Sequence, residues 1–147
     1  MKKILTKYEL QTLSEAIAEA EKRTSGEIRV VVRHRRHWAE KKLSLFELGL
    51  KEFHSLGMQK TKARSGVLIL LLLSERKFQI IADEGIHSKT TQEMWDEIAM
   101  SLTEHFKQGK FCKGLSESVR AVGQELAKHF PPEAGDKNEL PNEIVEK

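Results

Sequence analysis

Three short segments, far apart in the sequence, combine glycine with side chains that could bind ions. They are Thr24-Ser25-Gly26-Glu27, Arg64-Ser65-Gly66 and Asp83-Glu84-Gly85. Carboxylates, hydroxyls and backbone carbonyls supply the oxygen ligands that Ca²⁺ and Mg²⁺ prefer, and a guanidinium suits an anion. The residue types therefore give as candidate cation ligands Asp83, Glu84 and Glu27, and as candidate anion-binding residues Arg64, Ser65 and Ser25.

A simpler interpretation of the same residues stays open. Clusters of Ser, Thr, Gly and Asp are ordinary turn chemistry. Arg64 could also form a structural ion pair with Glu27 or Asp83. Which interpretation applies depends first on whether the three segments meet in space.

Hydrophobic patterns place the three segments at the ends of predicted strands. Residues 27–33 are β-branched and alternate, which indicates a strand. Residues 66–73 form a continuous apolar run, typical of a central strand buried on both faces. A polar turn at 74–77 leads into a third strand at 78–81. If the first two strands run parallel and the third returns antiparallel, the three segments share one edge of the sheet.

Four predicted helices surround these strands. Capping boxes at Thr6-x-x-Glu9 and Thr90-x-x-Glu93 open the first and third of them. A helix over residues 38–53 connects the first two strands, and the last helix spans about 113–129, before two prolines.

The predicted fold class is α/β, with a mixed sheet covered by helices on both faces in the order α-β-α-β-β-α-α. The crossover between the parallel strands should be right-handed. Residues 1–130 are expected to form a single domain, and residues 131–147 a polar, acidic, extended tail.

The composition excludes several classes of protein. The chain has 147 residues, 39% hydrophobic and 32% charged, which fits one folded domain. Its longest apolar run, 67–73, is too short to span a bilayer, and Lys7 and Glu9 interrupt any signal-peptide core. We therefore expect a cytoplasmic location and no membrane partner. The single cysteine, Cys112, excludes an internal disulfide and zinc sites built on two or more cysteines.

Charge is unevenly distributed along the chain. The net charge is +3, but residues 22–64 contain twelve Lys or Arg against four Asp or Glu. The densest basic segment is His34-Arg35-Arg36-His37-Trp38, whose two histidines have no evident third partner for a metal. Its arginines, with Arg33, could bind phosphates or single-stranded RNA. The preferred interpretation is a solvated loop in which Trp38 starts the core of the following helix.

Several different short motifs follow one another in a particular order along almost the whole chain. They include Thr24-Ser25-Gly26-Glu27, Leu56-Gly57-Met58, Arg64–Ile69, Ile80–Ile86, Trp95, Phe106-x-x-Gly109-x-Phe111, His129-Phe130-Pro131 and Asn138-Glu139-Leu140-Pro141. In this arrangement the sequence resembles the TPM domain family, as a short soluble bacterial member. The resemblance implies a mixed sheet sandwiched by helices, acid phosphatase activity in some members and calcium binding in some bacterial domains.

The resemblance also implies individual site residues. The residues that match by position are Glu27, Arg64 and Asp83. Two positions depart from the family pattern. At position 65 this chain has Ser where the family often has Asn, and the Ser hydroxyl still offers an oxygen ligand. At positions 82–83 it has Ala82-Asp83 where the family often has a second glycine-Asp pair.

Three functions are compatible with these observations. The first is weak binding of Ca²⁺ or Mg²⁺ with a phosphate-containing small molecule, and slow phosphomonoester hydrolysis by resemblance only. The second is a non-catalytic module for a protein partner, using the acidic tail around 138–141 and the basic helix over 38–53. A basic-patch RNA or phosphate binder using Arg33, Arg35 and Arg36 ranks last. Whether the domain is an enzyme stays open.

Overall fold

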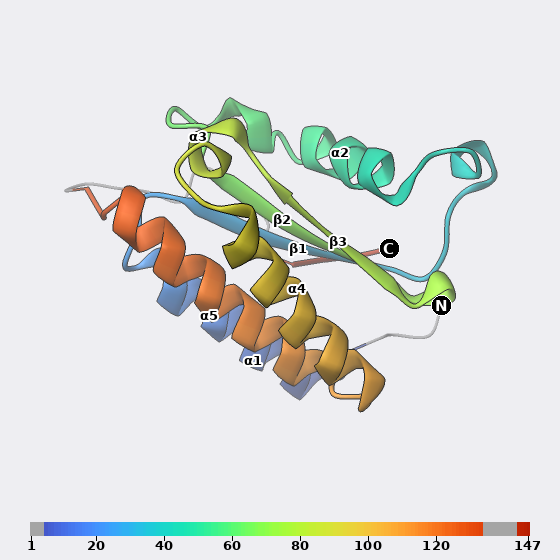
Figure 1. Ribbon diagram of the computed structural model, residues 1–147. Helices are drawn as coiled ribbons and strands as arrows, with labels where there is room; N and C mark the ends of the chain where they lie inside the picture. The colour runs from blue at the N-terminus through green and yellow to red at the C-terminus, as the bar shows by residue number, and fades with distance from the viewer. Residues whose placement is uncertain (1–4, 134–143) are drawn as a thin grey trace.

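The computed structural model describes residues 5–133 and 144–147 and shows a four-stranded mixed sheet between two layers of helices (Figure 1). The strands are β1 (Glu27–Arg33), β2 (Gly66–Leu72), β3 (Lys77–Ala82) and β4 (Ile144–Glu146). The helices are α1 (Lys7–Glu21), α2 (Leu45–Ser55), α3 (Glu84–His87), α4 (Gln92–Lys107) and α5 (Phe111–His129). Three short 3-10 turns are η1 (Trp38–Glu40), η2 (Met58–Lys60) and η3 (Leu73–Glu75).

The sheet has the strand order β3-β2-β1-β4. β1 and β2 run parallel, with Glu27 opposite Gly66, and β3 returns antiparallel, with Val67 opposite Ala82. The predicted parallel pair, central strand and hairpin are thereby confirmed. The hairpin turns through η3 and Arg76, whose φ of 51° is in the left-handed region.

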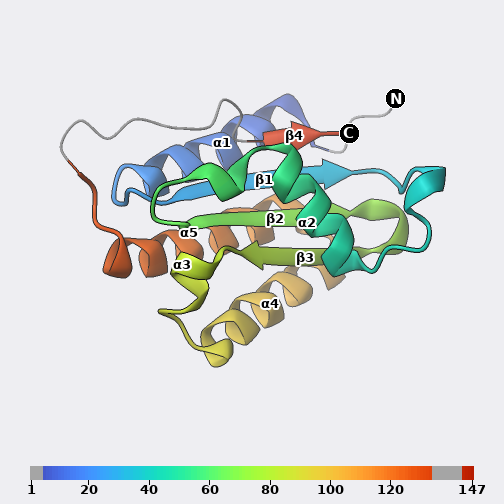
Figure 2. The ribbon, with the colours of Figure 1, turned by 90° about the horizontal axis from the view of Figure 1, so that it is seen from above.

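The two faces of the sheet bury separate hydrophobic cores. One core lies between the sheet and α1, α4 and α5, and the other lies beneath α2 (Figures 1 and 2). Strand alternation divides β1 between them, because Ile28, Val30 and Val32 face the first core and Val31 faces the second. Helices therefore cover both faces, as predicted. None of the helices in the described part is long and apolar enough to cross a membrane.

The helix expected over residues 38–53 is shorter than predicted. Only the turn η1 forms at residues 38–40, and α2 begins at Leu45 after Ser44, which forms a capping box with Glu47. The prediction that Trp38 starts a helix core is wrong, because Trp38 is 82% exposed. The box Ser44-x-x-Glu47 is the local signal in the sequence that starts α2.

Two further details differ from the sequence analysis. α4 is capped by Thr91 rather than Thr90, and the Thr90 hydroxyl instead accepts the indole N–H of Trp95 at 2.9 Å. Residues 144–146, expected within an extended tail, form β4 and pair in parallel with β1. The motif at 138–141 lies outside the described residues.

Candidate functional site

The three candidate segments meet at one edge of the sheet. β1 and β2 both begin there, and β3 ends there, because Glu27 lies opposite Gly66 and Val67 opposite Ala82. We call the charged and hydroxyl residues at this place the edge cluster, which consists of Ser25, Glu27, Arg64, Ser65, Asp83 and Glu84.

Arg64, Asp83 and Glu84 form the connected part of the edge cluster. The Arg64 guanidinium donates from Nε to Asp83 Oδ2 and from Nη2 to Asp83 Oδ1, both at 2.7 Å. Its Nη1 lies 3.4 Å from Glu84 Oε1. The side chains of Arg64 and Glu84 are 41% and 74% exposed, whereas that of Asp83 is 6% exposed. Hydrogen bonding to Asp83 raises the pKa of the Arg64 guanidinium. The site is therefore an ion triad open to solvent on one side.

The backbone around the triad is tightly constrained. Asp83 is the N-cap of α3 and accepts the Glu84 N–H at 2.8 Å, while its own N–H donates to the Gly66 carbonyl. The Gly85 N–H donates to the Arg64 carbonyl at 2.9 Å. Arg64 has a φ of 53°, a left-handed conformation that residues with a β-carbon rarely adopt. The turn at Arg64 and the start of α3 thus hold each other in place.

Gly85→Ala should destabilise this arrangement by about 1–3 kcal/mol or more. A Cβ at position 85 would lie 2.0 Å from the Ala63 carbonyl oxygen and 2.5 Å from that of Arg64, so the backbone would have to move. Gly109→Ala is the matched control, because a Cβ at position 109 would meet no atom within 4 Å and only the φ of 73° opposes alanine there. Urea denaturation of both variants measures the difference. Equal losses would show that the contact at Gly85 is unimportant.

The other three members of the edge cluster lie nearby but have different contacts. Glu27 is buried, and its carboxylate accepts Arg29 Nη2 at 3.1 Å. Ser65 is buried with its N–H directed to the Thr61 hydroxyl. Ser25 is half-buried, and its N–H donates to the backbone of the segment after α5. The structure thus joins Arg64, Asp83 and Glu84 through side-chain contacts, whereas Glu27, Ser25 and Ser65 lie at the same sheet edge with partners of their own.

A cation at this edge would have a small set of protein ligands. Among residues 5–133 and 144–147, no group of three or more His, Cys, Asp or Glu side chains could hold a metal ion. The side-chain donors at hand are the carboxylates of Asp83 and Glu84, both of which contact Arg64. Oxygen donors of these kinds fit Ca²⁺ or Mg²⁺ with water completing the shell, and they fit weak binding.

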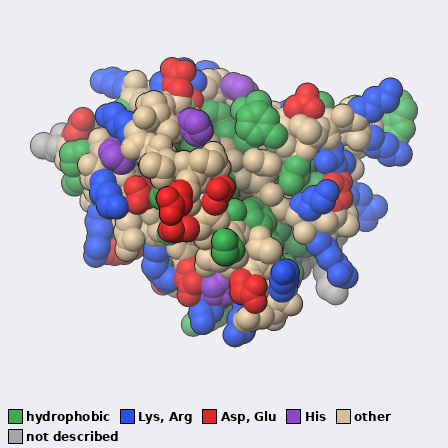
Figure 3. All heavy atoms as spheres, viewed as in Figure 1, with side chains coloured by type: hydrophobic (Ala, Val, Ile, Leu, Met, Phe, Trp, Pro, Cys, Tyr) green, Lys and Arg blue, Asp and Glu red, His purple; other side chains and the backbone are tan. Residues whose placement is uncertain are grey.

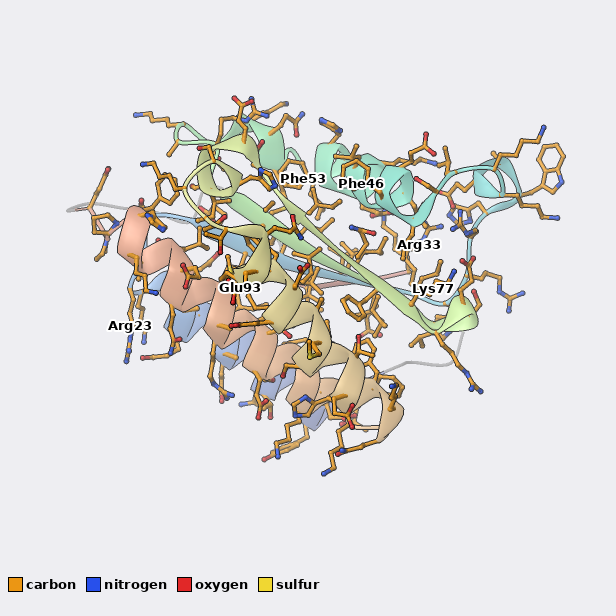
Figure 4. The ribbon with its side chains drawn as sticks, viewed as in Figure 1. Arg23, Arg33, Phe46, Phe53, Lys77 and Glu93 are labelled. Carbon is orange, nitrogen blue, oxygen red and sulfur yellow. The ribbon has the colours of Figure 1, made fainter. Side chains whose placement is uncertain are left out.

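Two arginines at and just after the end of β1 are engaged in internal contacts. Arg33 is 1% exposed, and its guanidinium donates to Glu40 at 2.6 and 3.1 Å and to Glu52 at 3.2 Å (Figure 4). Arg36 donates from Nε to Glu75 at 2.5 Å. Two of the three arginines considered for phosphate or RNA binding therefore stabilise the fold.

This burial of charge on β1 was not predicted from the sequence. Arg29 and Arg33 alternate with Ile28, Val30 and Val32, a pattern that usually places the charged face in water. Here that face is covered, and buried carboxylates neutralise both arginines. Glu40 and Glu52 follow β1 in the sequence, and they were the residues that could have indicated buried partners for Arg33.

Comparison with known proteins settles the family. The model of the TPM domain matches residues 1–125. The chain belongs to the TPM domain family. The BA42 protein of the psychrophilic bacterium Bizionia argentinensis is 35% identical, and its NMR structure aligns with a TM-score of 0.89 over 100% of this chain and 98% of that one.

More distant likenesses concern the fold alone. The N-terminal domain of a P. gingivalis protein is 22% identical and has a TM-score of 0.70 over 88% of this chain and 83% of that one. The N-terminal domain of the cg2496 protein from Corynebacterium glutamicum is 11% identical, with a TM-score of 0.62 over 98% and 82%. None of the curated proteins matches the sequence.

Proposed function

We propose that this TPM domain binds a divalent cation, Ca²⁺ or Mg²⁺, weakly at Asp83 and Glu84, together with a phosphate group held by Arg64. The observation that carries the proposal is the ion triad itself, in which a half-exposed guanidinium bridges two carboxylates. The triad already holds a positive charge where a metal ion would sit. A phosphate oxygen would give Arg64 a new partner and leave the carboxylates to the cation.

The backbone conformation of Arg64 supports a role in ligand binding. A left-handed φ at a residue with a β-carbon is unfavourable, and glycine would adopt it without strain. Such strain is common where a side chain is held for function. Arg64 keeps its side chain there despite the strain, and that side chain reaches solvent.

Hydrolysis of the bound phosphate is a separate prediction, which rests on the family resemblance rather than on geometry. Asp83 is the buried carboxylate of the triad and would lie beside the proposed cation, but both its oxygens accept hydrogen bonds from Arg64. Ser65 is buried. Binding is therefore proposed as the primary function, and slow hydrolysis as a secondary one.

Cation binding is tested by NMR titration of ¹⁵N-labelled protein with Ca²⁺. The parent should show saturable shifts at residues 63–66 and 83–87, with a dissociation constant on the order of 10⁻⁵ to 10⁻³ M. Asp83→Asn should lose these shifts and stay folded, because Asn caps a helix as well as Asp does. Asp96→Asn removes an exposed carboxylate outside the edge cluster and should bind like the parent.

Two results would contradict the proposal. Shifts confined to other carboxylates would place the cation elsewhere, and unchanged binding by a folded Asp83→Asn protein would exclude that residue as a ligand. The amide spectrum of each variant reports whether the fold is intact.

A further inference from the structure

An open groove follows the solvent-facing side of β3. Two hollows of about 630 Å³ and about 890 Å³ lie along the strand, and Phe78 lines both. Residues of α4 line both hollows, and Phe46 of α2 lines the first of them. The two hollows meet at Phe78, and we call them together the groove; Glu84 is the one member of the triad that lines it.

β3 is an edge strand within the described part of the chain. It pairs with β2 alone, and β2 alone lies beside it in the strand order. In an antiparallel pair, alternate residues direct their backbone N–H and C=O groups away from the partner. Edge strands are usually shielded by proline, bulges or inward charges. β3 carries no proline, and its centre, Gln79–Ile81, is uncharged. The outward carbonyl of Ile80 accepts the side-chain amide of Gln79 at 3.3 Å, so a strand added to β3 would displace that contact at the centre of the edge.

Helices α4 and α2 both lie beside the β3 edge and line the groove there. Figure 2 shows α4 extending past the β3 edge, on the side away from β2. A strand added to β3 would lie over α4. A second copy that joined its own β3 here would bring its own α4 into the same space. Phe46, 51% exposed, stands on the other side of the groove and would cover an added strand (Figure 4).

The groove has opposite charges at its two ends. Glu84 and Asp96 line the hollow where β3 ends, whereas Arg76, Lys77 and Lys107 line the hollow where β3 begins. None of these three cations forms a salt bridge among the residues that the structure describes. Figure 3 shows Asp and Glu side chains gathered over the start of α4 and Lys and Arg side chains toward the β2–β3 hairpin, with apolar side chains between.

We propose that the groove binds an extended segment of a protein partner, which pairs antiparallel with β3 as a fifth strand. An antiparallel segment runs from the acidic end of the groove to its basic end. The segment therefore carries basic residues at its amino end, alternating apolar residues in its middle and acidic residues at its carboxyl end. Backbone hydrogen bonds supply affinity in this mode, and charge and side-chain pockets supply direction and specificity.

The test uses two synthetic nonapeptides with blocked ends and the same central residues. One is Arg-Lys-Val-Thr-Val-Thr-Val-Asp-Glu, and the other has the charges exchanged, Asp-Glu-Val-Thr-Val-Thr-Val-Arg-Lys. In NMR titrations of the parent, the first peptide should shift the amides of β3 and α4 and bind at least about tenfold more tightly than the second. A version of the first peptide with N-methyl groups on its valines should not bind, because it cannot pair with β3.

A charge-reversed groove gives the decisive comparison. The triple variant Lys77→Glu, Lys107→Glu and Asp96→Lys should prefer the second peptide. A control with the same change in charge at exposed positions away from the groove, Lys22→Glu, Lys113→Glu and Glu15→Lys, should keep the parent's preference. Neither variant alters Arg64, Asp83 or Glu84, so the result is independent of cation binding.

Any of the following results would contradict the proposal. An absence of shifts on β3 at about 1 mM peptide, equal affinity for the two charge orders, or binding of the N-methylated peptide would each exclude directional strand addition. Concentration-dependent shifts of β3 without peptide would instead identify a second copy as the occupant.

Discussion

Replacing Glu40 with alanine should lower the free energy of unfolding by about 3–5 kcal/mol, because it leaves a buried guanidinium without its main partner. Glu40 is 1% exposed, accepts two hydrogen bonds from Arg33 and lies 2.8 Å from Lys51 Nζ. Its carboxylate also accepts the His37 N–H at 2.7 Å. Urea denaturation followed by circular dichroism at pH 7 measures the loss.

Glu19→Ala is the matched control for this prediction. Glu19 also pairs with two cations, Lys22 and Arg23, but its side chain is 58% exposed. Exposed pairs contribute about 0–1 kcal/mol. Equal losses in the two variants would show that burial of the Arg33–Glu40 pair does not matter to stability.

The effect of Glu40→Ala should depend on pH. Hydrogen bonding from Arg33 lowers the pKa of Glu40 well below its ordinary value of 4.5. A carboxyl group whose pKa is lowered by folding contributes its full stabilisation above its unfolded pKa, and loses it as the pH falls toward the folded pKa. The difference in unfolding free energy between parent and variant should therefore be constant near pH 7 and shrink below pH 4.5.

Trp95→Ala should cost about 3 kcal/mol or more of unfolding free energy, as truncation of a buried aromatic does. Trp95 is 8% exposed and belongs to the core between the sheet and α1, α4 and α5, and its indole N–H donates to Thr90. Trp38→Ala is the control within the same chain, because Trp38 is 82% exposed and surface changes are usually within about 0.5 kcal/mol. A loss under about 1 kcal/mol for Trp95→Ala, or similar losses for both, would contradict the packing described.

The part of the fold that sequence predicts well is encoded by local patterns. Alternation at 27–33, the apolar run at 66–73 and the polar turn after it lead directly to β1, β2 and β3, and chain connectivity then makes the first two parallel. β4 has no such signal, because its three residues, Ile144–Glu146, become a strand only through pairing with β1, more than 100 positions earlier. Strand pairing over that distance is a tertiary effect that local propensity does not contain.

The candidate site, like the fold, was only partly predictable from the sequence. Strand order predicts that the three segments converge, and the pairing of Arg64 with Asp83 was one of two interpretations that the residue types allowed. Sequence could not decide between Glu27 and Asp83 as its partner. Glu27 lies within β1, where its side chain meets the buried Arg29, whereas Asp83 follows the end of β3 as a helix cap. Which carboxylate faces the Arg64 side chain is therefore set by side-chain direction at the strand ends.

Calorimetric titration with Mg²⁺, with and without saturating phenyl phosphate, tests most directly whether Arg64 links a cation to a phosphate. In the parent, phenyl phosphate should tighten Mg²⁺ binding at least about fivefold, and Mg²⁺ should tighten phenyl phosphate binding by the same factor, because coupling is reciprocal. Arg64→Gly removes the guanidinium and suits the left-handed φ of 53°. This variant should bind Mg²⁺ alone more tightly than the parent and show no effect of phenyl phosphate. Equal Mg²⁺ affinity in the parent with and without phenyl phosphate would contradict the account.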